Sequence, residues 1–126
     1  MKRLAISWIT VAWLPLMIFL DGCSREAAPP ATISADQLPS VVERAFVKAN
    51  PELKQSAARV AELLRASNYT KAYAVLGDLA EKPGLSKEQR RIVASALLTV
   101  NGLLQTAVTQ GDAQAAKTLN YIRENK

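Results

Sequence analysis

The sequence predicts an all-α domain of about five helices that follows a short apolar segment at the N-terminus. Three observations lead to this expectation. Apolar residues recur at spacings of three and four from residue 34 to the end of the chain, which is the helical period. Proline, glycine and asparagine interrupt that pattern at intervals of about a helix length. No stretch shows a convincing period of two, which would indicate a half-buried strand.

The first element has the pattern of a secretory signal. Lys2 and Arg3 precede an apolar run from residue 4 to residue 20. The run lies at the short edge of the ~17–25 residues that span a bilayer as a helix, so a cleaved signal and a retained anchor helix are both open. In either case the two basic residues hold the N-terminus in the cytoplasm, and the rest of the chain emerges on the far face.

The residues after this run distinguish the two alternatives. The tetrapeptide Leu20-Asp21-Gly22-Cys23 resembles a bacterial lipobox, although Asp21 stands where the pattern prefers a small uncharged residue. The resemblance implies that residues 1–22 are a cleaved lipoprotein signal peptide. It also implies that Cys23 becomes the lipidated N-terminus, and Ser24 after it favours the outer membrane of a Gram-negative cell, facing the periplasm.

Residues 23–33 have no hydrophobic periodicity and contain Pro29-Pro30, so we expect a flexible tether. Near polyproline geometry, at ~3.1 Å per residue, it would reach roughly 30 Å. The helical domain is expected over residues 34–126. The lipid on Cys23 would anchor that domain to the membrane.

The first helix of the domain is expected to start near Pro39, after a turn over residues 34–38, because proline lacks the N–H that a helix interior needs. Its apolar stripe runs to Ala49. Asn50 and Pro51 then suit the N-cap and the first position of a second helix, over about residues 51–66.

A third helix is predicted over about residues 69–82, where Lys82-Pro83-Gly84 ends it. Ser86 and Gln89 form a capping box for a long fourth helix over about residues 87–109. Gly102 inside that helix predicts a kink or a close crossing by another helix. The fifth helix ends near Glu124. The apolar residues expected on the buried stripe of the third helix are Tyr69, Ala72, Tyr73, Leu76, Leu79 and Ala80.

Two stretches match each other and suggest a pair of helical hairpins, about 51–82 and 87–124. The first match is between Val60-x-x-Leu63-Leu64 and Val100-x-x-Leu103-Leu104. The second aligns the turn residues Asn68-Tyr69 with Gly111-Asp112. The apolar residues of the second helices also recur with the same spacing. These are Ala72, Leu76 and Leu79 in the first unit and Ala115, Leu119 and Ile122 in the second.

The turn and second helix of the first hairpin resemble part of a tetratricopeptide (TPR) repeat, through Tyr69, Ala72, Leu76 and Pro83. The resemblance implies hairpins stacked in a TPR-like row. The first helix lacks the family's aromatic residue and Leu-Gly pair, and the period is longer than the 34 residues of that family. A small antiparallel bundle with alanine-rich seams fits the same pattern equally well.

Composition excludes several kinds of chemistry. The chain has no histidine, and its one cysteine is Cys23, so His/Cys zinc sites and histidine-activated nucleophiles are ruled out. No glycine-rich phosphate loop is present. We expect no enzyme and no cofactor or metal. The acidic residues are spread among basic ones in the manner of a solvated face. The acidic residues that a carboxylate-based enzyme would have to use include Glu43, Glu52, Glu62, Asp78, Glu81 and Glu88.

The charge balance is moderately basic. Cleavage after residue 22 would remove Lys2, Arg3 and Asp21 and lower the net charge from +5 to +4. Because basic and acidic residues alternate along the helices, we expect no nucleic-acid partner. Two functions remain open. One is a lipid-anchored envelope protein whose helical domain binds another envelope protein, and the other is a structural envelope-surface protein whose basic domain associates with anionic lipid or polymer.

The candidate partner-binding residues are two tyrosines and two arginines. Tyr69 and Tyr73, together with Tyr121, either line a groove or belong to the core with their hydroxyls reaching water, and the second alternative is favoured. Arg90 and Arg91 either bind an anionic group or lie in solvent near a helix start.

Overall fold

The computed structural model describes residues 32–125, and this part of the chain is all helical. The signal peptide of residues 1–22, the lipidation site Cys23 and the tether as far as residue 31 lie outside the described residues. The five helices confirm the predicted fold class and have no strand among them in the described range. They are α1 Leu38–Ala45, α2 Pro51–Arg65, α3 Tyr69–Glu81, α4 Lys87–Thr109 and α5 Ala113–Glu124.

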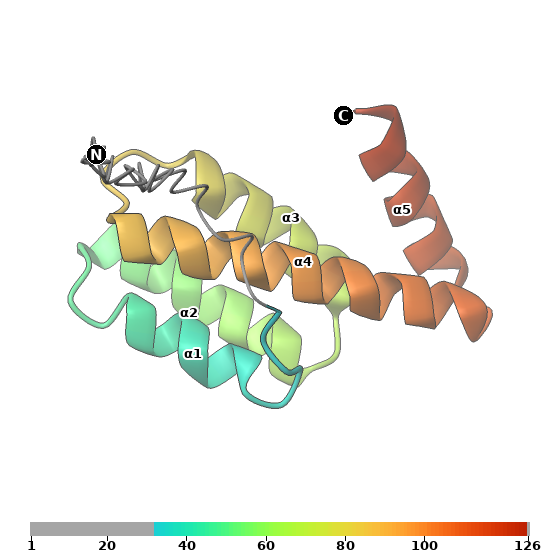
Figure 1. Cartoon of the computed structure of the whole chain (residues 1–126), viewed down its shortest axis with the longest axis horizontal. Coiled ribbons are helices and arrows are strands. Elements are labelled where there is room, and N and C mark those ends of the chain that lie inside the picture. The colour runs from blue at the N-terminus through green and yellow to red at the C-terminus, as the bar shows by residue number, and fades with distance from the viewer. Residues whose placement is uncertain (1–31, 126) are drawn as a thin grey trace, which may run out of the picture.

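The first four helices close into a small bundle, and the fifth packs outside it (Figure 1). Helix α1 packs against α2 and α4, and α3 packs against the same two helices from the other side. Helices α2 and α4 are therefore diagonal to each other rather than neighbours. A row of stacked hairpins would lay α2 beside α4. The sequence left open a row of stacked hairpins and a small antiparallel bundle. The structure has the bundle arrangement.

The core runs along the axis of this bundle and continues under α5. It is built mainly from leucine, valine and alanine, with Phe46 as its one aromatic ring among the fully buried side chains of the described residues. Its members contributed by α1 and the turn after it are Leu38, Val42 and Phe46. Those of α2 and α3 are Leu53, Ala57, Val60, Ala61, Leu64, Ala72, Leu76 and Leu79. Those of the remainder are Leu85, Ile92, Val93, Ala96, Val100, Leu104, Ala115 and Leu119.

Helix α1 starts within one residue of the predicted position but ends four residues before Ala49. The helix gives way to tighter turns, in which the amides of Phe46 and Val47 donate to the carbonyls of Glu43 and Arg44. Pro51 prevents the helix from continuing through Asn50, because the residue before a proline is driven into an extended conformation. Asn50 has that conformation, with φ −60° and ψ 160°, so the chain must leave the helix before it.

Both predicted N-caps are confirmed, and one of them also joins two helices. The side chain of Asn50 accepts from the amide of Leu53 at 2.9 Å. Ser86 and Gln89 form the full capping box of α4. Gln89 uses its Oε1 atom in that box and donates its Nε2 to the carbonyl of Ala45 at 3.1 Å. The N-terminus of α4 is thereby tied to the C-terminus of α1.

The α2–α3 and α4–α5 connections are the same turn. In the first, Ser67 has φ +56°, its amide donates to Leu64 O, and the Asn68 amide donates to Leu63 O. This is a Schellman motif, in which the residue after the helix takes the left-handed conformation. Asn68 then serves as the N-cap of α3 by accepting from the amide of Lys71.

In the second connection Gly111 has φ +90° and donates to Val108 O, while Asp112 donates to Ala107 O and caps α5. Ser67 therefore corresponds to Gly111 and Asn68 to Asp112, so the turn alignment made on the sequence was wrong by one residue. In this register Leu104, rather than Val100, is the equivalent of Val60. The sequence alignment of α2 with α4 was therefore wrong by one helical turn. Such an error arises easily because similar apolar residues recur at every turn of these helices.

Gly102 does not mark a close helix crossing. A Cβ atom added at this residue would have no heavy atom within 4 Å outside its own helix, and the residue is exposed. Helix α4 runs unbroken from Lys87 to Thr109, and the hydroxyl of Thr106 donates to the Gly102 carbonyl at 3.1 Å. The close crossing that the sequence suggested is absent.

Helix α4 is also long and apolar enough to cross a membrane by length and composition alone. Its packing explains that composition. Helix α4 contacts α1, α3 and α5, and the residues it buries lie at helical spacings along most of its length. They are Ile92, Val93, Ser95, Ala96, Val100 and Leu104.

The last residue of the predicted tether belongs to the folded domain. The Thr99 hydroxyl donates to the Ile33 carbonyl at 2.9 Å and accepts from the Ile33 amide at 3.1 Å. The half-buried Ile33 side chain packs against the core. The chain therefore joins the domain at the middle of α4, and the tether ends no later than Thr32.

Ala72 and Ala115 occupy positions with no room for a larger side chain, since their exposures are 0% and 1%. Replacing either with leucine should overpack the α3 or α5 contact and cost about 1–3 kcal/mol of unfolding free energy. Ala113→Leu, on the exposed first turn of α5, is the control and should cost little. Urea melts of the three variants make the measurement. Equal shifts at all three positions would contradict the packing described.

Gln89→Ala should weaken both the cap of α4 and its bond to α1. We expect a loss of about 1–3 kcal/mol, because one backbone amide and the Ala45 carbonyl lose their partners. The matched control is Gln105→Ala on the exposed face of the same helix. Denaturant titration of both variants gives the comparison, and a Gln105 variant as unstable as the Gln89 variant would refute the assigned role.

Candidate functional site

A groove between α3 and α5 is the main hollow on the bundle. Helix α5 begins beside the start of α3 and then points away from the bundle (Figure 1). The two helices are close at one end, where the Thr118 hydroxyl donates to the Thr70 hydroxyl at 3.3 Å. Beyond that contact they enclose a volume of about 520 Å³. The lining residues are Thr70, Tyr73, Ala74, Gly77, Asp78, Glu81, Lys117, Thr118, Tyr121 and Ile122.

The floor of this groove is apolar. Tyr73 and Ile122 are half-buried against the core below it. Gly77 leaves open space, since nothing lies within 4 Å of the position a Cβ would take. Tyr121 is 68% exposed at the α5 wall, although it carries one of the largest side chains in the described domain. An exposed aromatic ring beside a half-buried aliphatic one is a surface that a second molecule could cover.

The rim carries opposite charges on its two sides. Asp78 and Glu81 lie on the α3 side and Lys117 on the α5 side. Within residues 32–125 none of these three takes part in an ion pair. Their charges are therefore directed to solvent along the edges of the groove.

The ionisable groups with shifted pKa values lie elsewhere and form three ion pairs, two of which join neighbouring helices. A two-fold hydrogen bond from Arg65, at 2.8 and 2.9 Å, lowers the pKa of Glu43 and joins α2 to α1. A hydrogen bond from Lys82 likewise lowers the pKa of Glu52 and joins α3 to α2. The Lys82 side chain is partly buried and the other three side chains are largely exposed, and ion pairs of this kind contribute little to stability.

The third pair lies within α4, where Arg91 hydrogen-bonds Glu88 three residues earlier and lowers the pKa of that carboxyl. The same hydrogen bond raises the pKa of Arg91, and the bond to Glu43 raises that of Arg65.

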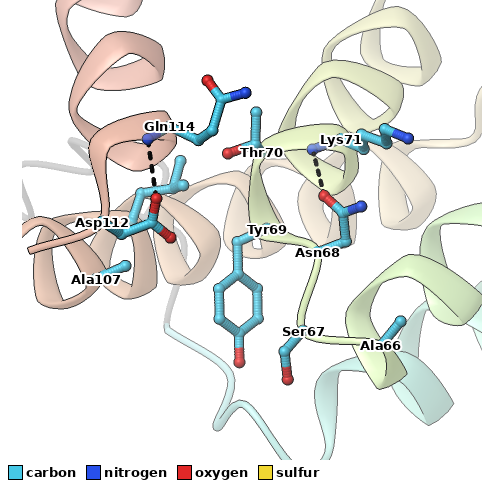
Figure 2. Close-up of a pocket in the computed structure, with 10 residues that line it drawn as sticks. Ala66, Ser67, Asn68, Tyr69, Thr70, Lys71, Ala107, Asp112 and Gln114 are labelled. Carbon is cyan, nitrogen blue, oxygen red and sulfur yellow. Dashed lines mark hydrogen bonds between the residues drawn. The ribbon is translucent and has the colours of Figure 1, made fainter. Parts of the chain in front are cut away.

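A second hollow of about 430 Å³ lies between the two equivalent turns (Figure 2). Tyr69 stands near its centre, with the α2–α3 turn on one side and the α4–α5 turn on the other. Two of its polar side chains cap the helices that begin beside it. Asn68 accepts from the Lys71 amide, and Asp112 accepts from the Gln114 amide. This hollow therefore lies between the N-terminal caps of α3 and α5.

The four predicted partner-binding residues fall in separate places. Tyr73 lines the α3–α5 groove and Tyr69 the adjacent hollow. Arg90 donates to the Leu85 carbonyl at 3.1 Å and borders a third hollow of about 220 Å³ between α3 and α4. Arg91 is held by Glu88. The structure does not bring the arginines together with the tyrosines.

Two sequence expectations near the groove were wrong. Tyr121 was expected in the core, but its position just before Ile122 takes it off the buried stripe and into solvent. Ala80 was placed on the buried stripe of α3 and is exposed. Sequence reasoning also gave no binding role to Gly77 or Lys117. In the sequence, Gly77 and Lys117 differ from the core residues only in lying outside the apolar stripes of their helices.

Comparisons with protein-family models, with curated proteins and with solved structures find no match for this chain. Among residues 32–125 no group of three acidic, cysteine or histidine side chains is arranged to hold a metal ion. The site is accordingly defined by the groove itself, with its apolar floor, its exposed tyrosine and its two charged rims.

Proposed function

We propose that this protein is a lipid-anchored envelope protein whose helical bundle is a small protein-interaction module, with the α3–α5 groove as its binding surface. The observation that carries this proposal is Tyr121, 68% exposed at the edge of an apolar groove. Tyrosines in such positions are enriched at protein–protein interfaces, where the ring supplies contact area at a low cost in conformational entropy. A catalytic function has no comparable support in the described residues.

The membrane anchor rests on the sequence. The lipobox-like residues 20–23 and the apolar run before them support acylation of Cys23. Two or more acyl chains anchor stably, since each buried methylene contributes ~0.8 kcal/mol. The hydrogen bonds of Ile33 to Thr99 support the same arrangement, because they attach the chain to the bundle only ten residues after Cys23.

A second candidate is association of the bundle with anionic lipid or polymer. The observation in its favour is the turn after α1, where Val47 is 57% exposed and is followed by the exposed Lys48. Lys87 starts α4, which the Gln89 bond holds against the end of α1. This end of the bundle therefore combines an apolar tip with basic residues. It has no enclosing groove, which is why we rank it second.

Lipidation is tested by metabolic labelling with a fatty-acid analogue. The wild-type protein should incorporate the label and Cys23→Ala should not, because the thiol of Cys23 is the one acceptor of this kind in the chain. A mass of the mature N-terminus that begins at an acylated Cys23 would agree. Labelling of both proteins, or of neither, would exclude the lipoprotein assignment.

The groove is tested by filling it without disturbing the fold. Gly77→Leu should place a side chain in the open groove and abolish partner binding, while the loss of a mid-helix glycine should favour helix α3. Gly102→Leu is the matched control, since Gly102 is also mid-helical and without neighbours within 4 Å, and it lies outside the groove. The measurement is stoichiometric co-purification from detergent-solubilised envelopes.

The wild type and Gly102→Leu should retain the partner and Gly77→Leu should lose it. Equal retention by both variants would place the interface away from the groove. Association with envelopes that is unaffected by either change but is released by salt would favour the second candidate instead, because screening weakens contacts to anionic surfaces.

A further inference from the structure

A separate, smaller hollow lies between α3 and α4, next to the α3–α5 groove. Tyr73, Gly77 and Ala80 follow one another on α3 at spacings of four and three, so they form one stripe along the helix surface. Tyr73 and Gly77 line the α3–α5 groove, and Ala80 lines the third hollow together with Ala94 and Leu97 of α4 and two of their neighbours. The two hollows therefore lie side by side, and both use the α3 surface.

The shape of this surface suits a helix. Ala74, Gly77 and Ala80 on α3 and Ala94 on α4 present small side chains, so a second backbone can approach closely, as packed helices do at interaxial distances of 8–10 Å. A peptide that binds by β-strand addition would need an exposed strand edge to pair with. The described residues contain no strand, and their backbone hydrogen bonds are made within helices and turns.

The rims specify the charge of such a helix. Asp78 and Glu81 are three residues apart on α3, are both exposed, and have no ion-pair partner within the described range. They attract basic residues on the flank of the bound helix that faces α3. Lys117, on the opposite rim, repels basic residues on the other flank. The complementary helix is therefore basic on one side only.

We propose that the α3–α5 groove binds an amphipathic helix of a partner protein, with its apolar stripe in the groove and a Lys/Arg flank against Asp78 and Glu81. This inference rests on the proposed interaction function and specifies its partner. A second copy of the chain is a poor occupant. The apolar stripes of α1 to α5 are largely buried in the bundle, and the exposed residues of α5 other than Tyr121 are mainly polar, among them Asn120 and Arg123.

Two synthetic peptides of about 18 residues, long enough to form helices, test the charge preference. They share a leucine stripe and differ in one flank, which carries lysines in the first and glutamates in the second. Binding of each fluorescein-labelled peptide to the full-length protein in non-ionic detergent is followed by anisotropy at low salt. The wild type should prefer the lysine peptide about five- to tenfold, as expected for a few exposed ion pairs.

Asp78→Lys combined with Glu81→Lys should reverse that preference. The matched control is Asp36→Lys combined with Glu62→Lys, which changes the net charge equally at two exposed carboxylates outside the groove and should keep the wild-type preference. Unchanged thermal midpoints would show that both double variants fold. Raising the salt concentration should reduce the preference, because exposed ion pairs are screened.

Gly77→Leu separates this inference from the proposed function. If it weakens both peptides equally and the wild type shows no charge preference, the groove binds helices but the basic-flank proposal is overturned. If neither peptide binds, or Gly77→Leu leaves both unaffected, the helix proposal is overturned. Co-purification with Gly77→Leu and Gly102→Leu then decides the proposed function independently.

Discussion

The contact of α1 with α4 is the constraint on which the rest of the structure depends. Leu38, Val42 and Phe46 are fully buried, and the side chain of Gln89 joins the last carbonyl of α1 to the first turn of α4. With this contact in place the first four helices form a ring, and each buries its apolar stripe against two neighbours. Without it, α4 would be free to pack on α2, as it would in a row of stacked hairpins.

The length of α4 turns this closed ring into a molecule with a groove. Helix α4 has 23 residues and α3 has 13, so at 1.5 Å per residue α4 is longer by roughly 15 Å. Its far end extends past the bundle (Figure 1), and α5 can bury Ala115 and Leu119 only against that end and the start of α3. Because α5 then points away from α3, the groove opens between them. The binding surface is thus a consequence of unequal helix lengths.

The candidate site was visible in the sequence only in part. Tyr73 was singled out because an aromatic ring on an apolar stripe is either core or interface, and it borders both in the structure. Gly77 and Lys117 carried no such signal, because a glycine within a helix and an isolated lysine look alike on a free surface and at a groove. Arg90 and Arg91 were conspicuous as a pair, yet each bonds to its own helix or the turn before it.

The sequence by itself determined the turns and the helix boundaries, with the exception of the end of α1. Asn50, Pro51, Ser86 and Gly111 act within a few residues of the helix ends, so their effects do not depend on the fold. The tertiary structure alone decided which helices are neighbours, where Ile33 joins α4, and that Tyr121 remains exposed. Burial of apolar surface is non-directional. The same alanine-rich stripes satisfy a stack or a bundle, and only the simultaneous packing of all five helices selects one.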